Sequence, residues 1–151
     1  MQIQLFIERL TQATGKKFGL PSEAEWAFAA KGGNKSKGYK FSGSDNIDDI
    51  GWYAGNAQKR LQPVATKQPN ELGLYDMSGN VWEWCADYWH RNYDYKPSDG
   101  GAWLRSREAH NIRVYRGGSW EQYGDLSRFS ARQGAHPVNG NNNIGFRFAR
   151  Y

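Results

Sequence analysis

The pattern of hydrophobic and polar positions predicts two short helices at the start of the chain. Over residues 2–14 apolar side chains recur every three or four positions, and Gly15 follows where a helix commonly ends. A second helix is expected over residues 23–31. There Ser22 and Glu25 have the spacing of an N-terminal capping box, and a run of apolar residues follows them.

The rest of the chain alternates between polar loops and short strands. Residues 34–72 and 90–109 are rich in small and polar residues, and scattered aromatic side chains are expected to hold these long loops in place. Three strands are predicted where apolar and polar residues alternate, over 113–116, 128–132 and 144–148. The pattern therefore predicts a single α+β domain over residues 1–151, with two N-terminal helices, a small, twisted antiparallel sheet and long ordered loops.

A glycine-marked turn at the centre of the chain leads into alternating aromatic and polar side chains. Alternation places Trp82 and Trp84 on one face of an extended segment and Glu83 on the other. Two indoles can bury about 150–250 Å² each, so we expect them in the core. Asp76 and Glu83 flank the turn, and carboxylates with backbone carbonyls are the ligands that Ca²⁺ selects. The alternative is a buried Glu83 that is hydrogen-bonded to loop amides.

Composition narrows the classes of function. Seven Trp, nine Tyr and seven Phe among 151 residues are typical of a folded core and not of a disordered chain. The net charge of +5 comes from Lys and Arg residues spread along the chain, so we expect no nucleic-acid partner. Cys85 is the only cysteine, so no internal disulfide can form. We expect no signal peptide and no membrane span, which is compatible with a cytoplasmic or a phage- or virion-associated location.

Four motifs resemble those of the formylglycine-generating-enzyme, or sulfatase-modifying-factor, domain family. They are Gly19-Leu20-Pro21-Ser22-Glu23-Ala24-Glu25-Trp26, residues 73–84, Arg116-Gly117-Gly118-Ser119-Trp120 and Gly145-Phe146-Arg147. The resemblance covers nearly all of the chain and implies a C-type-lectin-like fold. The opening strands of that family's domain have no counterpart here. We therefore expect a homo-oligomer or a partner domain to cover the strand edge that is left open.

The resemblance also bears on catalysis and metals. The enzymes of this family bind copper through two cysteines five residues apart, and thiolates suit Cu(I). The two positions hold Gln122 and Ser127 here, so we expect no copper and no enzyme activity. The resemblance further implies a structural Ca²⁺ at the central turn, held by the side chains of Asp76 and Glu83 and the carbonyls of Gly79 and Val81.

The segment between the last two motifs is the candidate ligand-binding face. In the C-type-lectin fold it presents side chains on one side, and Tyr, Ser, Gly and Asn are common in adaptable binding surfaces. The candidate residues are Trp120, Glu121, Gln122, Tyr123, Asp125, Phe129, Ser130, Gln133, His136, Val138, Asn139, Asn141, Asn142 and Asn143.

This segment resembles the variable region of diversity-generating-retroelement proteins, in which mutation at adenines turns Asn codons into others. The leading hypothesis is a non-catalytic protein that binds an unknown protein or surface ligand through a variable face over residues 120–143. An ordinary polar loop is the alternative for the segment itself. For the whole chain the alternatives are an oxidase homologue acting on protein cysteine and a structural or assembly domain.

Overall fold

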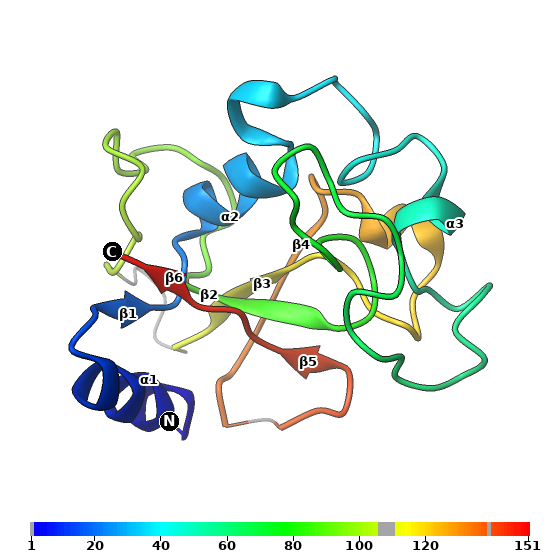
Figure 1. Cartoon of the computed structure of the whole chain (residues 1–151). Coiled ribbons are helices and arrows are strands. Elements are labelled where there is room, and N and C mark those ends of the chain that lie inside the picture. Colours follow the sequence, from blue (N-terminus) through cyan, green and yellow to red (C-terminus); the bar gives the residue numbers. More distant parts are fainter. Residues whose placement is uncertain (1, 106–110, 139) are drawn as a thin grey trace.

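The computed structural model describes residues 2–105, 111–138 and 140–151. Its elements are α1 (Gln2–Thr14), β1 (Phe18–Gly19), α2 (Glu23–Ala30), η1 (Gly33–Lys35), α3 (Ile47–Ile50), β2 (Trp82–Tyr88), β3 (Arg113–Arg116), η2 (Gly124–Ser127), β4 (Arg132–Ala135), β5 (Ile144–Gly145) and β6 (Ala149–Arg150). Figure 1 shows a small twisted sheet across the centre, with α2 above it, α1 at one end and long loops around the other. The mixed fold with little regular structure is confirmed.

Both predicted helices form, and their local signals act as expected. Gly15 adopts a φ of 66° and its N–H donates to the carbonyl of Thr11, which ends α1. The capping box is complete, because the Ser22 hydroxyl accepts from the Glu25 N–H and the Glu25 carboxylate accepts from the Ser22 N–H. The short helix α3, which follows Asn46 as N-cap, lies in a segment predicted as loop.

The four-stranded sheet has the order β4-β3-β2-β5, and a separate pair joins β1 to β6. The β1–β6, β2–β3 and β3–β4 pairings are antiparallel. The prediction of an antiparallel sheet is wrong at β5, which lies parallel to β2 with Trp82 opposite Ile144. The cause is a crossover, since the chain leaves one edge of the sheet after β4 and begins β5 at the other edge.

Two of the three predicted strands have different bounds. The strand expected over 128–132 is wrong, because Arg128 and Ala131 close turns through hydrogen bonds from their N–H groups, and β4 begins only at Arg132. Of the strand expected over 144–148 only β5 forms, because Phe146 contacts the ring of Phe6 on α1 instead of continuing the ladder. The next strand, β6, begins beyond the predicted range, at Ala149. The predicted strand at 113–116 is confirmed.

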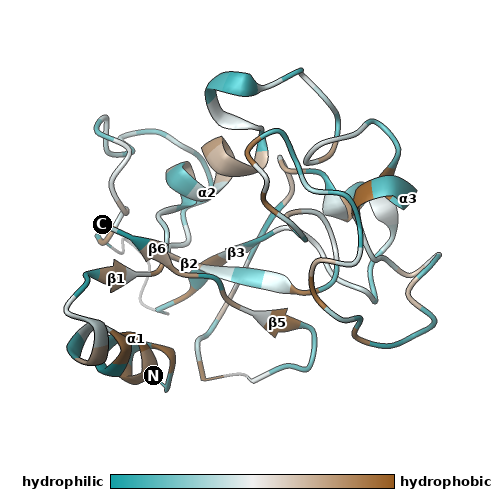
Figure 2. Ribbon diagram, viewed as in Figure 1, coloured by the Kyte–Doolittle hydropathy of each residue, from teal (hydrophilic) through white to brown (hydrophobic). Residues whose placement is uncertain are grey.

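The tryptophans of β2 lie in the core, as expected. Trp82 and Trp84 are only 3% and 6% exposed, and the ring of Tyr115 lies edge-on to both at 5.1 and 5.3 Å. Trp26 and Met77 are also fully buried. In Figure 2 the long loops are mainly hydrophilic, whereas β2 is pale despite its burial because its interior residues are Trp and Glu.

Candidate functional site

The central turn is fixed in place by close backbone packing. Gly79 has a φ of 90°, and a Cβ there would overlap the carbonyl oxygen of Trp52, so only glycine fits. Its N–H donates to the carbonyl of Gly117 at 2.7 Å, and the Trp120 N–H donates to the carbonyl of Asn80 at 2.8 Å. These bonds join the turn directly to the Arg-Gly-Gly-Ser-Trp segment.

Glu83 ties three distant parts of the chain together. Its carboxylate accepts from the indole Nε1 of Trp26 at 2.7 Å and from Nε and Nη2 of Arg147 at 2.6 and 2.7 Å. Burial alone would lower the pKa of Arg147, but the charge and hydrogen bonds of Glu83 raise it. Glu83 is therefore a buried, hydrogen-bonded carboxylate, although its partners are side chains and not the loop amides expected.

The ligands predicted for Ca²⁺ at the turn are all oxygen atoms, which is the donor type that this ion prefers. One oxygen of Asp76 accepts from the Ala65 N–H, while Oδ1 is buried without a hydrogen bond within the described residues. A carboxylate offers about four lone-pair positions and three donors occupy those of Glu83, which leaves one on Oε1. No group of three or more His, Cys, Asp or Glu side chains suited to a metal occurs in the part of the chain that the structure describes. A site here would thus need the Gly79 and Val81 carbonyls as well.

A second buried carboxylate, Glu23 at the start of α2, lies among two arginines. It accepts from Arg116 Nη1 at 2.6 Å and from Arg132 Nε and Nη2 at 2.8 and 2.7 Å, and the Tyr93 hydroxyl donates to it at 3.2 Å. Burial would raise the pKa of Glu23, but the hydrogen bond from Arg132 and the charge of Arg116 outweigh it and lower the pKa. Asp87 also accepts from the Glu23 N–H.

This cluster joins α2, the start of the Arg-Gly-Gly-Ser segment at the end of β3, and β4, and it was not predicted as a unit. Glu23 and Arg116 belong to recognised motifs, and Arg132 lies in the candidate face segment. Nothing in their spacing shows that they meet, because they are 93 and 109 positions away from Glu23 in the chain.

Most of the predicted ligand-binding residues are exposed. The exposed members are Glu121, Tyr123, Asp125, Ser130, Gln133, His136, Val138, Asn141 and Asn142. Trp120, Gln122 and Phe129 are half-buried, and Asn139 lies outside the described residues. Figure 1 places the segment around η2 beside α3, at the opposite end of the molecule from α1.

Two members of the predicted face point inward. Asn143 is buried, and its side-chain amide donates to Glu121 Oε2 at 2.9 Å, so the expectation that it is displayed is wrong. The bond has a clear role, since it joins the end of the 136–143 loop to the start of the face. Phe129 packs against the core cluster because the tight turn after η2 directs its ring inward.

The backbone beneath the exposed side chains is well anchored. The carbonyl of Gln122 accepts from the Ala54 N–H at 3.0 Å, and the carbonyl of Asn143 accepts from the Trp82 N–H at 2.9 Å. β4 is paired with β3 over its whole length, from Arg132 to Ala135. Exposed side chains on an anchored backbone are the arrangement that binding loops share.

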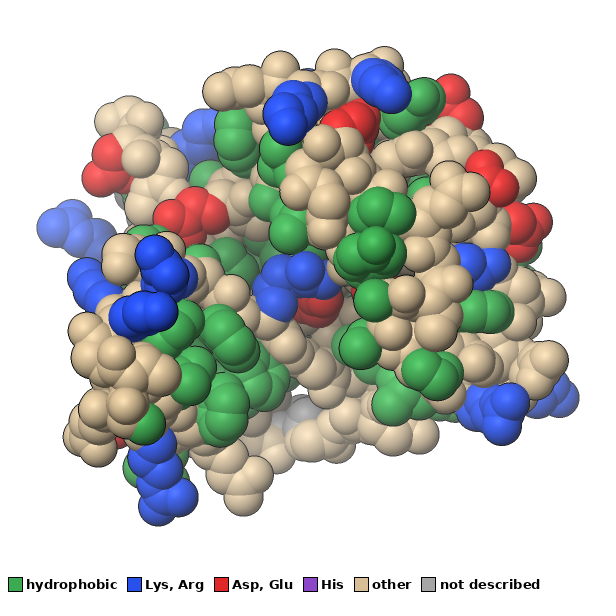
Figure 3. Space-filling view, viewed as in Figure 1, with side chains coloured by type: hydrophobic (Ala, Val, Ile, Leu, Met, Phe, Trp, Pro, Cys, Tyr) green, Lys and Arg blue, Asp and Glu red, His purple; other side chains and the backbone are tan. Residues whose placement is uncertain are grey.

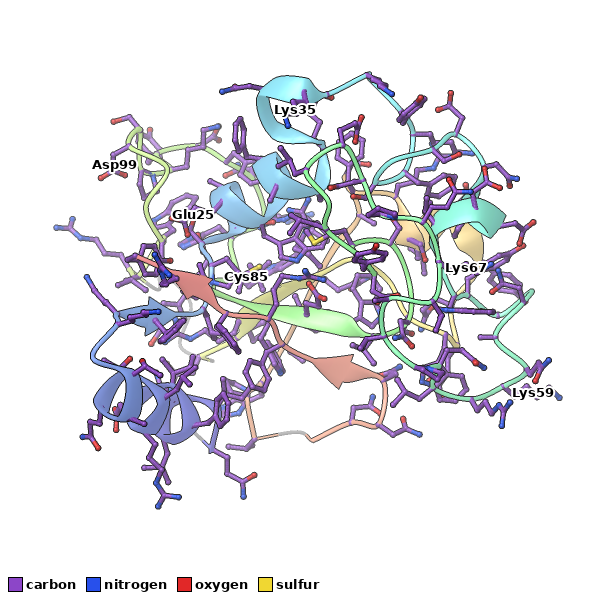
Figure 4. The ribbon with its side chains drawn as sticks, in the orientation of Figure 1. Glu25, Lys35, Lys59, Lys67, Cys85 and Asp99 are labelled. Atoms are coloured by element: carbon purple, nitrogen blue, oxygen red, sulfur yellow. The ribbon has the colours of Figure 1, made fainter. Side chains whose placement is uncertain are left out.

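The positions of the family's copper ligands cannot bind copper through thiolates. Ser127 is completely buried, and its hydroxyl packs so closely on Gly118 that a Cβ there would overlap it. Gln122 is half-buried on the neighbouring turn. Cys85 is buried in β2, and burial raises the pKa of its thiol well above the usual value. In Figure 4, Cys85 lies in the interior, whereas the labelled Lys35, Lys59 and Asp99 lie at the periphery.

No helix among the described residues is long and apolar enough to cross a membrane.

Comparisons with known proteins agree with the motifs. The sulfatase-modifying factor enzyme 1-like domain matches residues 8–151. The chain is 35% identical to the formylglycine-generating enzyme of Thermomonospora curvata, over 86% of this chain and 48% of that protein. It is 34% identical to inactive C-alpha-formylglycine-generating enzyme 2 of Mus musculus, over 86% and 42% of the two chains. The solved structure of Treponema denticola variable protein 1 has a TM-score of 0.76 and 36% identity, over 88% of this chain and 47% of that one.

The chain therefore spans less than half the length of each of these proteins, and its relatives include both an enzyme and a protein named as inactive. The match over residues 8–151 shows that the chain belongs to the sulfatase-modifying factor enzyme 1-like domain family.

Proposed function

We propose that this domain is a non-catalytic ligand-binding module, and that its binding surface is formed by exposed side chains of residues 120–142. The proposal rests on the contrast between exposed side chains, which form the surface, and buried side chains, which form the frame that supports it. Side chains such as Tyr123 and Val138 are exposed, whereas Ser119 and Ser127, in the same part of the chain, are fully buried. Such a surface can change its side chains without changing the fold.

The chemistry of the surface fits a protein ligand. Tyr123 supplies rigid aromatic area, and Ser130, Gln133 and Asn141 supply short or flexible hydrogen-bonding groups. The likeness to a protein named as variable supports a diversified face. An adjacent reverse-transcriptase gene and a near-copy of the final coding segment, differing only at adenines, would establish diversification. The absence of such a copy from the neighbouring DNA would exclude diversification.

We expect single substitutions at Tyr123, Ser130, Gln133, His136 and Val138 to change the free energy of unfolding by no more than roughly 0.5 kcal/mol each, because these side chains are exposed. A library randomised at Tyr123, Ser130, Gln133, His136 and Val138 should therefore fold, and selection against a test protein such as lysozyme should yield binders. Thermal melting measures folding, and surface display measures binding.

Variants in the frame are the control. Arg116→Ala and Arg132→Ala should fail or melt far below the parent, since both arginines contact buried Glu23. A library that mostly unfolds while these frame variants fold would overturn the assignment. Copper-dependent oxygen consumption by the purified protein would favour the oxidase alternative instead.

We also propose that a structural Ca²⁺ links the central turn to β2 through Asp76 and Glu83. A ligand that binds only the folded state raises stability, so chelation with EDTA should lower the melting temperature. Asp76→Asn should abolish this response, whereas the matched change Asp94→Asn in an exposed loop should leave it intact. Equal melting with and without EDTA would refute the site.

A further inference from the structure

Four large apolar side chains form an exposed patch around α1 and the end of the chain. The Phe patch consists of Leu5, Phe6, Phe146 and Phe148, which are each 36–48% exposed. The ring of Phe6 lies 5.8 Å from that of Phe146 and 6.4 Å from that of Phe148, so the three rings form one cluster, and Leu5 precedes Phe6 in α1. Figure 3 shows hydrophobic side chains gathered on this face, over α1 and β6.

A groove lies beside α1, whose residues Gln4, Ile7 and Glu8 form part of its lining. It has a volume of about 580 Å³, and its apolar lining includes Ile7, Leu20, Trp84 and Leu104. The Phe patch can contact apolar side chains of a ligand, and the groove can receive them. Contiguous exposed apolar surface of this kind marks an interaction site in soluble proteins.

The rim of the Phe patch is basic. Lys17 precedes Phe18, whose ring lies 5.3 Å from that of Phe148, and Arg150 lies opposite Phe18 in the β1–β6 pair. Lys16 and Arg9 are exposed nearby in sequence. Of the acidic groups on the adjoining helices, Glu8 is exposed and lines the groove, and Glu25 accepts hydrogen bonds from Ser22 and Tyr151. Like charges on two such rims would oppose pairing of two copies through this face.

We propose that the Phe patch is the docking surface for a polypeptide segment outside residues 1–151 that carries large apolar side chains with acidic residues beside them. The apolar side chains would cover the patch and enter the groove, and the acidic ones would meet Lys17 and Arg150. A polypeptide is favoured over a lipid surface because the relatives carry as much chain again beyond the part that matches. The Phe patch contains no residue of the face over residues 120–142, although Pro137 of that segment lines the groove. The proposal does not depend on the function of that face.

The test uses peptides displayed on phage as random 12-residue sequences, selected on the immobilised protein. Selected peptides should contain two or more large apolar residues with Asp or Glu. Phe6→Ser with Phe148→Ser should weaken their binding at least tenfold. Leu61→Ser, which alters a leucine of similar exposure elsewhere, should not change it. Lys17→Glu with Arg150→Glu, two exposed sites whose change leaves the rings intact, should weaken binding and reduce its salt dependence. Melting curves check that each variant folds.

Three results would overturn the proposal. The first is selected peptides that bind the double Phe variant as well as they bind the parent. The second is Phe-dependent binding to vesicles of phosphatidylcholine with 30% phosphatidylserine when no peptide is selected, which would assign the patch to a membrane. The third is a concentration-dependent dimer, seen by light scattering and lost in the double Phe variant, which would assign it to a second copy.

Discussion

Glu23→Gln is expected to lower the free energy of unfolding by about 3–5 kcal/mol, because it leaves two buried arginines without their anionic partner. The side chains of Arg116 and Arg132 are only 3% and 15% exposed, so little water can reach them to replace the lost carboxylate. Urea unfolding at pH 7 measures the change. Glu8→Gln, at an exposed residue of α1, is the matched control and should stay within roughly 0.5 kcal/mol of the parent.

The same variant has a distinct pH dependence. The pKa of Glu23 is lowered in the folded state, so its contribution to stability is present above the unfolded-state pKa of about 4.3. That contribution is lost as the pH falls through the folded-state pKa. The difference in stability between the parent and Glu23→Gln should therefore narrow in acid. A difference that stays constant between pH 7 and pH 3 would show that packing, and not charge, is lost.

Trp84→Ala is expected to lower the free energy of unfolding by about 3–5 kcal/mol, the usual loss for removing a buried indole, because the surrounding sheet cannot close the cavity. Trp84 is buried in the middle of β2, and it contacts the ring of Tyr115 and borders the groove beneath α1. Thermal and urea unfolding measure the loss.

Trp52→Ala is the matched control for that substitution. Trp52 is half-buried in a loop, where its indole donates to Thr66 and lies under the ammonium of Lys67. Removal of the Trp52 indole leaves an open surface and no enclosed cavity, so the loss of unfolding free energy should be clearly smaller than for Trp84→Ala. Equal losses at the two positions would mean that β2 does not form the centre of the fold.

Elements that depend on a few neighbouring residues could be predicted from the sequence. The end of α1 at Gly15 and the start of α2 at Ser22 each follow from one local hydrogen-bond pattern. The strand over 128–132 could not be excluded, because the same alternation also suits a turn in which Arg128 pairs with Asp125. The parallel β5 depends on a crossover, for which alternation carries no signal.

In the candidate site, too, only features that depend on neighbouring residues could be predicted from the sequence. Exposure of most of the face followed from its composition and its place between two motifs. The burial of Asn143 did not, because it depends on Glu121, 22 residues away in the chain. The Glu23 cluster likewise needs α2, β3 and β4 to be placed together before its charges can be paired. Calcium at the turn and ligand binding at the face stay predictions.

The pairing of β1 with β6 determines how this domain can be oriented when it is attached to something else. Phe18 lies opposite Arg150, and the Tyr151 N–H donates to the carbonyl of Lys17. Figure 1 shows both chain ends on the side of α1, away from η2 and α3. A tether joined to either end would therefore leave from the same side, and the segment around η2 would point outward from the surface that holds the domain.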